Sequence, residues 1–255
     1  MAAASLATAL KSLFLVLGCL AIATVIYAVA ADGLPFRKLT PLMAVTLMDI
    51  YVLEFIIWSW IVYKESNWIT AILWAVLLVC LGSVATCGYI VLQFLKLSTQ
   101  ESLQDPIYFA LLRHKRKTGT EQQRKCSLLT AGILSLALGS LMLCTLIYTF
   151  ATYRSSILRD SFTPWMLATI IQFFGNAVAL SVWVAYKESS WLNAAIWIIL
   201  IILFGSTIIC PYIALQLYDL SAQDPVYLVL FSSRNREENE GAKEPLKQRT
   251  WEGVN

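Results

Sequence analysis

Four polar residues stand inside long apolar stretches of this 255-residue chain, where a charge or an amide group is costly. They are two acids, Asp49 and Glu54, and two amides, Gln172 and Asn176. An ionisable group at membrane depth faces the interior of a helix bundle or a wet cavity, and marks a path for protons, ions or small solutes. We therefore predict that these four residues form an intramembrane polar site.

Helical geometry sorts these residues into faces. Asp49 shares a face with Lys64, and Gln172 shares the equivalent face with Asn176 and Lys187. Glu54 is turned about 140° away from Asp49 around the same helix, so the two acids are not a paired general acid and base. The amides have a second interpretation as interhelical hydrogen bonds worth about 0.6 kcal/mol each. Whether Asp49 is functional or structural stays open.

The chain offers no recognisable catalytic arrangement. It has one His and six Cys, with no Cys-x-x-Cys pair, no Gly-rich phosphate loop and no His-Glu-x-x-His motif. We expect no catalytic residues, no metal site and no cofactor, and we predict that the protein is not an enzyme. The formal net charge of +3 is too small to indicate a nucleic-acid partner.

Composition indicates that lipid is the solvent for most of the chain. Apolar residues make up 58% and charged residues 14%, and the mean hydropathy is +0.68; an ordinary soluble domain carries about 25% charged residues. A spanning helix needs about 20 apolar residues. Five charge-free intervals and one interval interrupted by two acids meet this need: Ser12–Ala31, Leu39–Tyr63, Ser66–Leu95, Cys126–Tyr153, Ser161–Tyr186 and Ser189–Tyr218.

We therefore predict an all-α, multi-pass integral membrane protein with six transmembrane helices. The second interval inserts only beside partners that cover its acids, so we expect it inside the bundle. The first interval has an alternative interpretation as a secretory signal, because Ala28-Val29-Ala30 is an acceptable cleavage site. Its similarity to the later span Cys126–Tyr153 favours a retained helix.

The chain contains an internal duplication. Pro41–Ser98 and Pro164–Ser221 match at 21 of 58 positions with a shift of 123 residues and no gap. This divides the chain into a first repeat (1–112), a basic linker (113–125), a second repeat (126–231) and a polar tail (232–255) that we expect to be disordered. Two directly joined copies of three spans must have opposite orientations, so we predict inverted three-helix repeats. A seventh span, or a Gln-Asp-Pro segment that dips into the bilayer, would make the copies parallel.

Two further features recur in both copies. Each has a Lys-Glu turn at the membrane interface, formed by Lys64 and Glu65 and by Lys187 and Glu188. These turns are either structural hairpins with a snorkelling Lys, or gates that bind a headgroup. In the third apolar stretch, Gly88 and Pro211 occupy equivalent positions, and we predict helix flexure there. Such paired interruptions point to a binding site, although close helix packing is the plainer explanation.

Asp-Pro pairs predict two helix starts, with Asp as the N-cap and Pro in the first turn. They are Asp105-Pro106 and Asp224-Pro225. A basic cluster follows the first pair and either attracts anionic lipid or fixes the topology; it comprises Arg113, Lys115, Arg116 and Lys117.

The duplicated Tyr-Lys-Glu-Ser-x-Trp and Gln-Asp-Pro-x-Tyr motifs resemble those of a plant family of multi-pass membrane proteins known only as a domain of unknown function. The resemblance extends from Leu13 to Phe231. It implies a membrane location and supplies no reaction or ligand. It also implies an Asp where this chain has Gln172, so any acid-dependent role belongs to the first copy.

Two functions are compatible with these features. We predict a small-solute or ion transporter whose polar centre lies between the inverted repeats. The alternative is a membrane scaffold or assembly factor, whose inner polar residues only hold helices together and whose basic linker and tail bind partners. The lipid bilayer is the one partner that the sequence indicates, and it specifies neither the membrane nor the oligomeric state.

Overall fold

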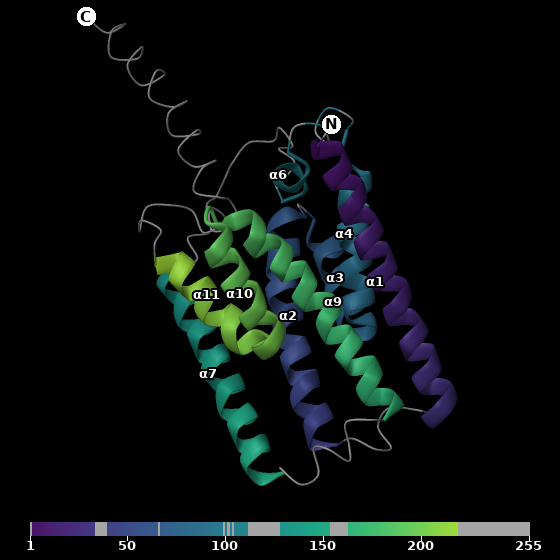
Figure 1. Cartoon of the computed structure of the whole chain (residues 1–255), viewed down its shortest axis with the longest axis vertical. Coiled ribbons are helices and arrows are strands. Elements are labelled where there is room, and N and C mark those ends of the chain that lie inside the picture. The colour runs from purple at the N-terminus through teal and green to yellow at the C-terminus, as the bar shows by residue number, and fades with distance from the viewer. Residues whose placement is uncertain are drawn as a thin grey trace, which may run out of the picture.

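The computed structural model describes residues 2–33, 40–65, 67–98, 100, 103, 105–111, 128–153 and 163–218. This part of the chain is built from α-helices (Figure 1), which confirms the predicted all-α class. The helices are α1 (Ala2–Asp32), α2 (Pro41–Lys64), α3 (Trp68–Leu81), α4 (Ser83–Leu95), α6 (Pro106–Leu111), α7 (Leu128–Thr152), α9 (Pro164–Lys187), α10 (Trp191–Phe204) and α11 (Ser206–Tyr218).

Within the described residues, four helices are long and apolar enough to cross a membrane. They are α1, α2, α7 and α9. Large apolar side chains on their outer faces are exposed, among them Ile26 at 63% and Ile133 at 67%. Such a surface needs hydrocarbon around it. The protein is therefore a multi-pass integral membrane protein in contact with the lipid bilayer, as predicted.

Local sequence explains how the inner spans α2 and α9 start and end. Thr40 and Thr163 are N-caps whose hydroxyl oxygens accept bonds from the backbone N–H groups of Met43 and Met166, each at 3.2 Å. A Pro follows each cap, at the position where its missing N–H costs nothing. Both helices end at a Lys, which suits the negative end of the helix dipole.

The third apolar stretch of each copy reverses direction instead of crossing. The Tyr89 hydroxyl donates to Oε1 of Glu65 at 3.1 Å, and the Tyr212 hydroxyl donates to Oε1 of Glu188 at 2.8 Å. The partners in each pair are 24 residues apart, which a continuous helix would separate by about 36 Å. The chain turns at Gly82, between α3 and α4, and again between α10 and α11. Each pair of helices is thus a helical hairpin.

This reversal corrects the prediction of six spans. The arms of the hairpins have 13 or 14 residues, or about 20 Å of helix, whereas the hydrocarbon core is about 30 Å thick. The two 30-residue apolar intervals were therefore long for a single span and short for two. Within the described residues, each copy has two long apolar helices followed by a hairpin of two shorter helices.

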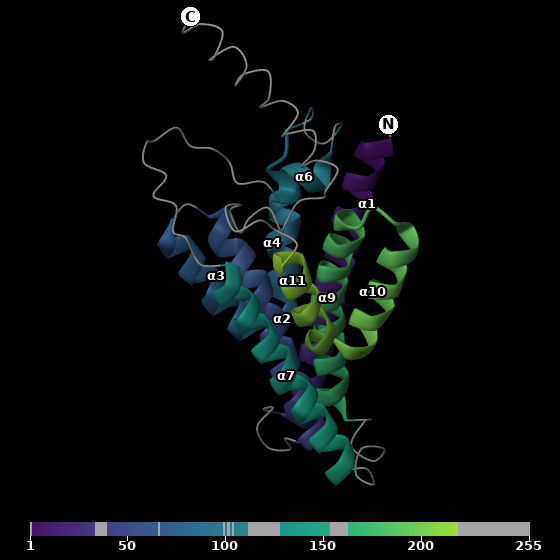
Figure 2. The ribbon, with the colours of Figure 1, turned by 90° about the vertical axis from the view of Figure 1, so that its left-hand side faces the viewer.

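The two copies run in the same direction, which corrects the expected inversion. The Lys64 ammonium donates to the carbonyl oxygen of Ala110, and the Tyr186 hydroxyl donates to Oδ2 of Asp105 at 3.1 Å. The carboxyl ends of α2 and α9 therefore both reach α6, at the top of Figure 1. Each copy has an even number of long helices before its hairpin, so two joined copies run in the same direction. Figure 2 displays α3 and α10 on opposite sides of the central helices.

Apolar contacts along the helices hold each copy together and also join the two copies. α1 packs along α4 and α9, and α7 packs along α11. The central cluster includes Leu53, Ile61 and Val184, whose side chains are fully buried. Small residues permit the closest crossings: a Cβ on Gly139 of α7 would lie 3.0 Å from Cβ of Cys210 in α11. Tight packing of this kind is the main attraction between helices in lipid.

One predicted helix start is confirmed, and several other predictions concern residues that the structure does not describe. Oδ1 of Asp105 accepts a bond from the backbone N–H of Tyr108 at 3.1 Å, at the start of α6. The basic linker (113–125), the second Asp-Pro pair and the polar tail (232–255) lie outside the described residues. The predictions of anionic-lipid binding and of disorder therefore stay predictions.

Candidate functional site

The tip of each hairpin is held by a side chain from the other copy. Oδ1 of Asp49 accepts bonds from the backbone N–H of Ser206, at 2.8 Å, and from its hydroxyl. Oε1 of Gln172 accepts the same two bonds from Ser83, both at 2.6 Å. The four residues are two equivalent pairs, offset by 123 positions. Asp49 and Gln172 thus satisfy backbone donors that a helix start leaves open.

Glycine makes this capping possible. Gly82 and Gly205 have φ angles of 60° and 55°, a region that side chains with a Cβ rarely adopt. A Cβ on Gly82 would lie 2.7 Å from Oε1 of Gln172, and a Cβ on Gly205 would collide with Oδ2 of Asp49. Each tip therefore needs glycine for its backbone angle and for the approach of the capping side chain.

The remaining two predicted site residues meet at the α3–α4 tip. Asn176 is fully buried; its Oδ1 accepts a bond from the Thr86 hydroxyl at 2.7 Å, and its Nδ2 lies 3.4 Å from Oε1 of Glu54. Glu54 is 4% exposed, and its Oε2 has no hydrogen-bond partner within the described residues. The same Glu54 Oε1 would lie 3.3 Å from a Cβ on Gly82.

The predicted polar site is therefore divided between the two tips. Glu54, Gln172 and Asn176 gather around the α3–α4 tip, whereas Asp49 holds the α10–α11 tip. This division agrees with the different helix faces expected for Glu54 and Asp49. The copies also differ here, because the equivalents of Glu54 and Asn176 are Ala177 and Leu53.

The interfacial turns make structural contacts. Glu65 and Glu188 accept the tyrosine hydroxyl bonds that close the hairpins, and Nε2 of Gln216 lies 3.4 Å from Oε1 of Glu188. The Lys64 ammonium lies 6.0 Å from the centre of the Trp60 ring, within range of a cation–π attraction. These contacts favour the structural interpretation of the Lys-Glu turns.

The third apolar stretch of each copy breaks one to two turns before Gly88 and Pro211, and the flexure that we predicted at these two residues stays a prediction. α4 continues through Gly88, and α11 continues through Pro211. The breaks are at Gly82 and Gly205 instead. The sequence did carry a signal for them, since Gly-Ser recurs near the middle of both 30-residue intervals.

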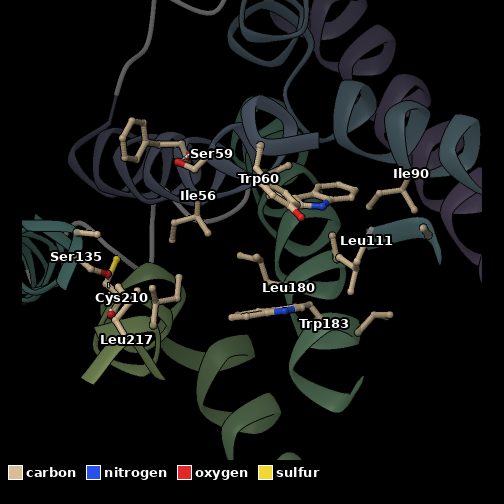
Figure 3. Close-up of a pocket in the computed structure, with 18 of the residues that line it drawn as sticks. Ile56, Ser59, Trp60, Ile90, Leu111, Ser135, Leu180, Trp183, Cys210 and Leu217 are labelled. Atoms are coloured by element: carbon tan, nitrogen blue, oxygen red, sulfur yellow. Dashed lines mark hydrogen bonds between the residues drawn. The ribbon is translucent and has the colours of Figure 1, made fainter. Parts of the chain in front are cut away.

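A cavity of about 510 Å³, which no motif predicted, lies between the copies (Figure 3). Its lining residues come from α1, α2, α4, α6, α7, α9 and α11. Trp60 and Trp183, which are equivalent residues of the two copies, both line it. Most other lining residues are aliphatic or aromatic, and none of Asp49, Glu54, Gln172 and Asn176 lines it. Only the duplicated Trp signals this site in the sequence.

Comparison with known proteins supplies a family. Residues 1–237 match the family described as "Protein of unknown function (DUF1475)". The chain belongs to the DUF1475 family. This confirms the expectation of a family defined only by its unknown function. No curated protein and no solved structure matches this DUF1475 chain. The family description contains no reaction, so a function has to be argued from the geometry.

Proposed function

We propose that the protein carries a small amphipathic molecule with a long apolar body, of the class of fatty acyl compounds, and binds it in the cavity between the two copies. The observation that carries this proposal is the cavity itself. Its volume of about 510 Å³ falls in the usual range of roughly 300–1,000 Å³ for ligand sites. Its position between the copies is typical of the substrate sites of transporters built from repeats.

The lining favours an apolar ligand over an ion or a polar solute. Aliphatic and aromatic side chains dominate, with a few polar groups such as Ser59, Gln93 and Ser135. The Ser135 hydroxyl already donates to the carbonyl oxygen of Cys210 at 2.8 Å. Among the four predicted polar residues, Asp49, Gln172 and Asn176 bond to protein groups away from the cavity. A hydrated solute would find too few partners here to replace its water.

The helix arrangement supports movement of the ligand as well as binding. Both copies contain an apolar stretch that turns back at a glycine, and parallel repeats with an axis along the membrane normal occur in known transporter folds. Residues of α2 and α7 line the same cavity, and these two helices share less contact than α1 and α9 do. We propose that ligand enters from the bilayer between α2 and α7. The duplication of a unit with two spans and one hairpin is part of this proposal.

The scaffold alternative depends on the basic linker and the tail, which lie outside the described residues. No contact of the described helices favours it. A non-enzymatic role remains part of our proposal, because a carrier needs no nucleophile or general base.

Photolabelling tests the proposal. The full chain in lipid nanodiscs is exposed to a diazirine-bearing stearic acid, and the labelled peptides are identified by mass spectrometry. We expect label on cavity residues of α2 and α7, and we expect excess oleate to reduce it. Ala131→Trp fills the cavity from α7 and should remove this label. Ala137→Trp adds the same bulk to the exposed face of α7 and is the matched control.

Two outcomes would contradict the proposal. One is label spread evenly over the exposed faces without competition by oleate. The other is cavity label that persists in a folded Ala131→Trp variant at the level of the control.

A further inference from the structure

We infer that Glu54 is a proton-binding site at the tip of the α3–α4 hairpin, holding an exchangeable proton on its carboxyl group, and that Asp49 is not. The two acids lie on the same helix, five residues apart. The two carboxyl groups differ in the number of hydrogen bonds that they accept. This inference goes beyond the proposed carrier function and does not depend on the identity of its ligand.

Asp49 has the environment of a structural cap. One of its oxygens accepts two bonds from Ser206, of which the backbone bond measures 2.8 Å. In the other copy, Gln172 makes the same two bonds to Ser83 with a neutral amide. Capping of a hairpin tip therefore needs an acceptor oxygen, and it does not need a titratable group.

Glu54 has the environment of a group that can hold a proton. It is 4% exposed, its only hydrogen-bond donor found within the described residues is the Asn176 amide at 3.4 Å, and its Oε2 has no partner there. An ionised carboxylate buried in this way lacks the donors that would replace its water. A proton on Oε2 removes the charge and leaves Oε1 free to accept the Asn176 bond.

The groups around Glu54 favour a proton over a metal cation. A monovalent or divalent cation needs several free oxygen ligands. The neighbouring oxygens already accept hydrogen bonds, with Gln172 Oε1 bonded to Ser83 and Asn176 Oδ1 bonded to Thr86. These α4 and α9 residues are uncharged, and Asp49, the other acid of α2, serves the opposite tip.

The position of Glu54 links its protonation to the conformation of the α3–α4 tip. Glu54 Oε1 would lie 3.3 Å from a Cβ on Gly82, the residue at which the hairpin turns. Loss of the proton would place a charge against this turn, close to the Gln172 oxygen that holds it. A change in the charge of Glu54 thus acts directly on the α3–α4 tip.

The first test uses dicyclohexylcarbodiimide on the full chain in liposomes. This apolar reagent reacts with a protonated carboxyl group: the acid oxygen bonds to the central carbon of the carbodiimide and the proton goes to one nitrogen, which gives an O-acylisourea. The acyl group then moves from that oxygen to a nitrogen, and the stable N-acylurea is detected by peptide mass spectrometry. We expect the adduct on Glu54 and not on Asp49. Absence of the adduct from Glu54, or an equal adduct on Asp49, would overturn the inference.

The second test compares two matched amide variants by infrared spectroscopy in nanodiscs. A neutral carboxylic acid has a C=O stretching band that is separate from the bands of carboxylates. We expect a pH-dependent band of this kind in the native chain, its loss in Glu54→Gln and its retention in Asp49→Asn. Retention in Glu54→Gln, or loss only in Asp49→Asn, would overturn the inference. Neither test uses the apolar ligand, so failure here and failure of the carrier proposal are distinguishable.

Discussion

The capping role of Asp49 makes a quantitative prediction that separates an acceptor oxygen from a charge. Asp49→Ala leaves the backbone N–H and the hydroxyl of Ser206 without their acceptor, and Ser206 is fully buried. An unsatisfied buried donor costs about 1–3 kcal/mol, and loss of an N-cap costs about 1 kcal/mol. We therefore expect Asp49→Ala to lower the free energy of unfolding by about 2–4 kcal/mol.

Asp49→Asn should behave differently, because it keeps the oxygen at the same distance from the backbone. The equivalent cap at Ser83 is already an amide. We expect it to cost less than about 1 kcal/mol, a typical value for a single neutral hydrogen bond. For a chain of this size, 1 kcal/mol corresponds to roughly 2–4 °C in Tm. Asp49→Ala should thus lower Tm by about 4–16 °C, and Asp49→Asn by less than about 4 °C.

Thermal unfolding in detergent micelles, followed by tryptophan fluorescence, measures both variants. A double-mutant cycle of Asp49→Ala with Ser206→Ala isolates the bond between the Asp49 carboxylate and the Ser206 hydroxyl. Ser206→Ala removes this hydroxyl and keeps the backbone N–H that Asp49 also accepts from. If Asp49→Asn unfolds as early as Asp49→Ala, the charge of Asp49 is what matters and the capping argument is refuted.

Two more predictions follow from the hairpins. Asn67 and Ser190 are equivalent residues after the two Lys-Glu turns. In a chain without its native cysteines, Asn67→Cys and Ser190→Cys should both react with a membrane-impermeant maleimide from the same side of proteoliposomes. Labelling from opposite sides would support the inverted arrangement instead. Gly205→Ala forces a Cβ into Asp49 at a φ of 55° and should lower the yield of folded protein sharply in size-exclusion chromatography. Gly88→Ala, where a Cβ would meet nothing within 4 Å, should leave that yield unchanged or raise stability by up to about 1 kcal/mol. Equal loss in both variants would contradict the special role of the tip.

Sequence alone determined the class of this protein and many of its local features. Low charge content and long apolar intervals require a membrane environment whatever the packing. The helix start at Asp105-Pro106 depends on contacts within one turn, and it appears in the structure where the sequence predicts it. The match between Pro41–Ser98 and Pro164–Ser221, with its equal spacing of motifs, is visible when the chain is aligned with itself.

Tertiary structure decided the direction of the chain and the roles of the acids. Composition does not distinguish a 30-residue apolar stretch that continues as one helix from one that turns back. The reversal depends on a single positive φ angle, at Gly82 in one copy and at Gly205 in the other. That angle is held by side chains distant in sequence: Asp49 and Ser206 are 157 residues apart. The roles of Asp49 and Glu54 likewise depend on neighbours that only packing brings together, and so does the cavity, whose lining residues come from both copies.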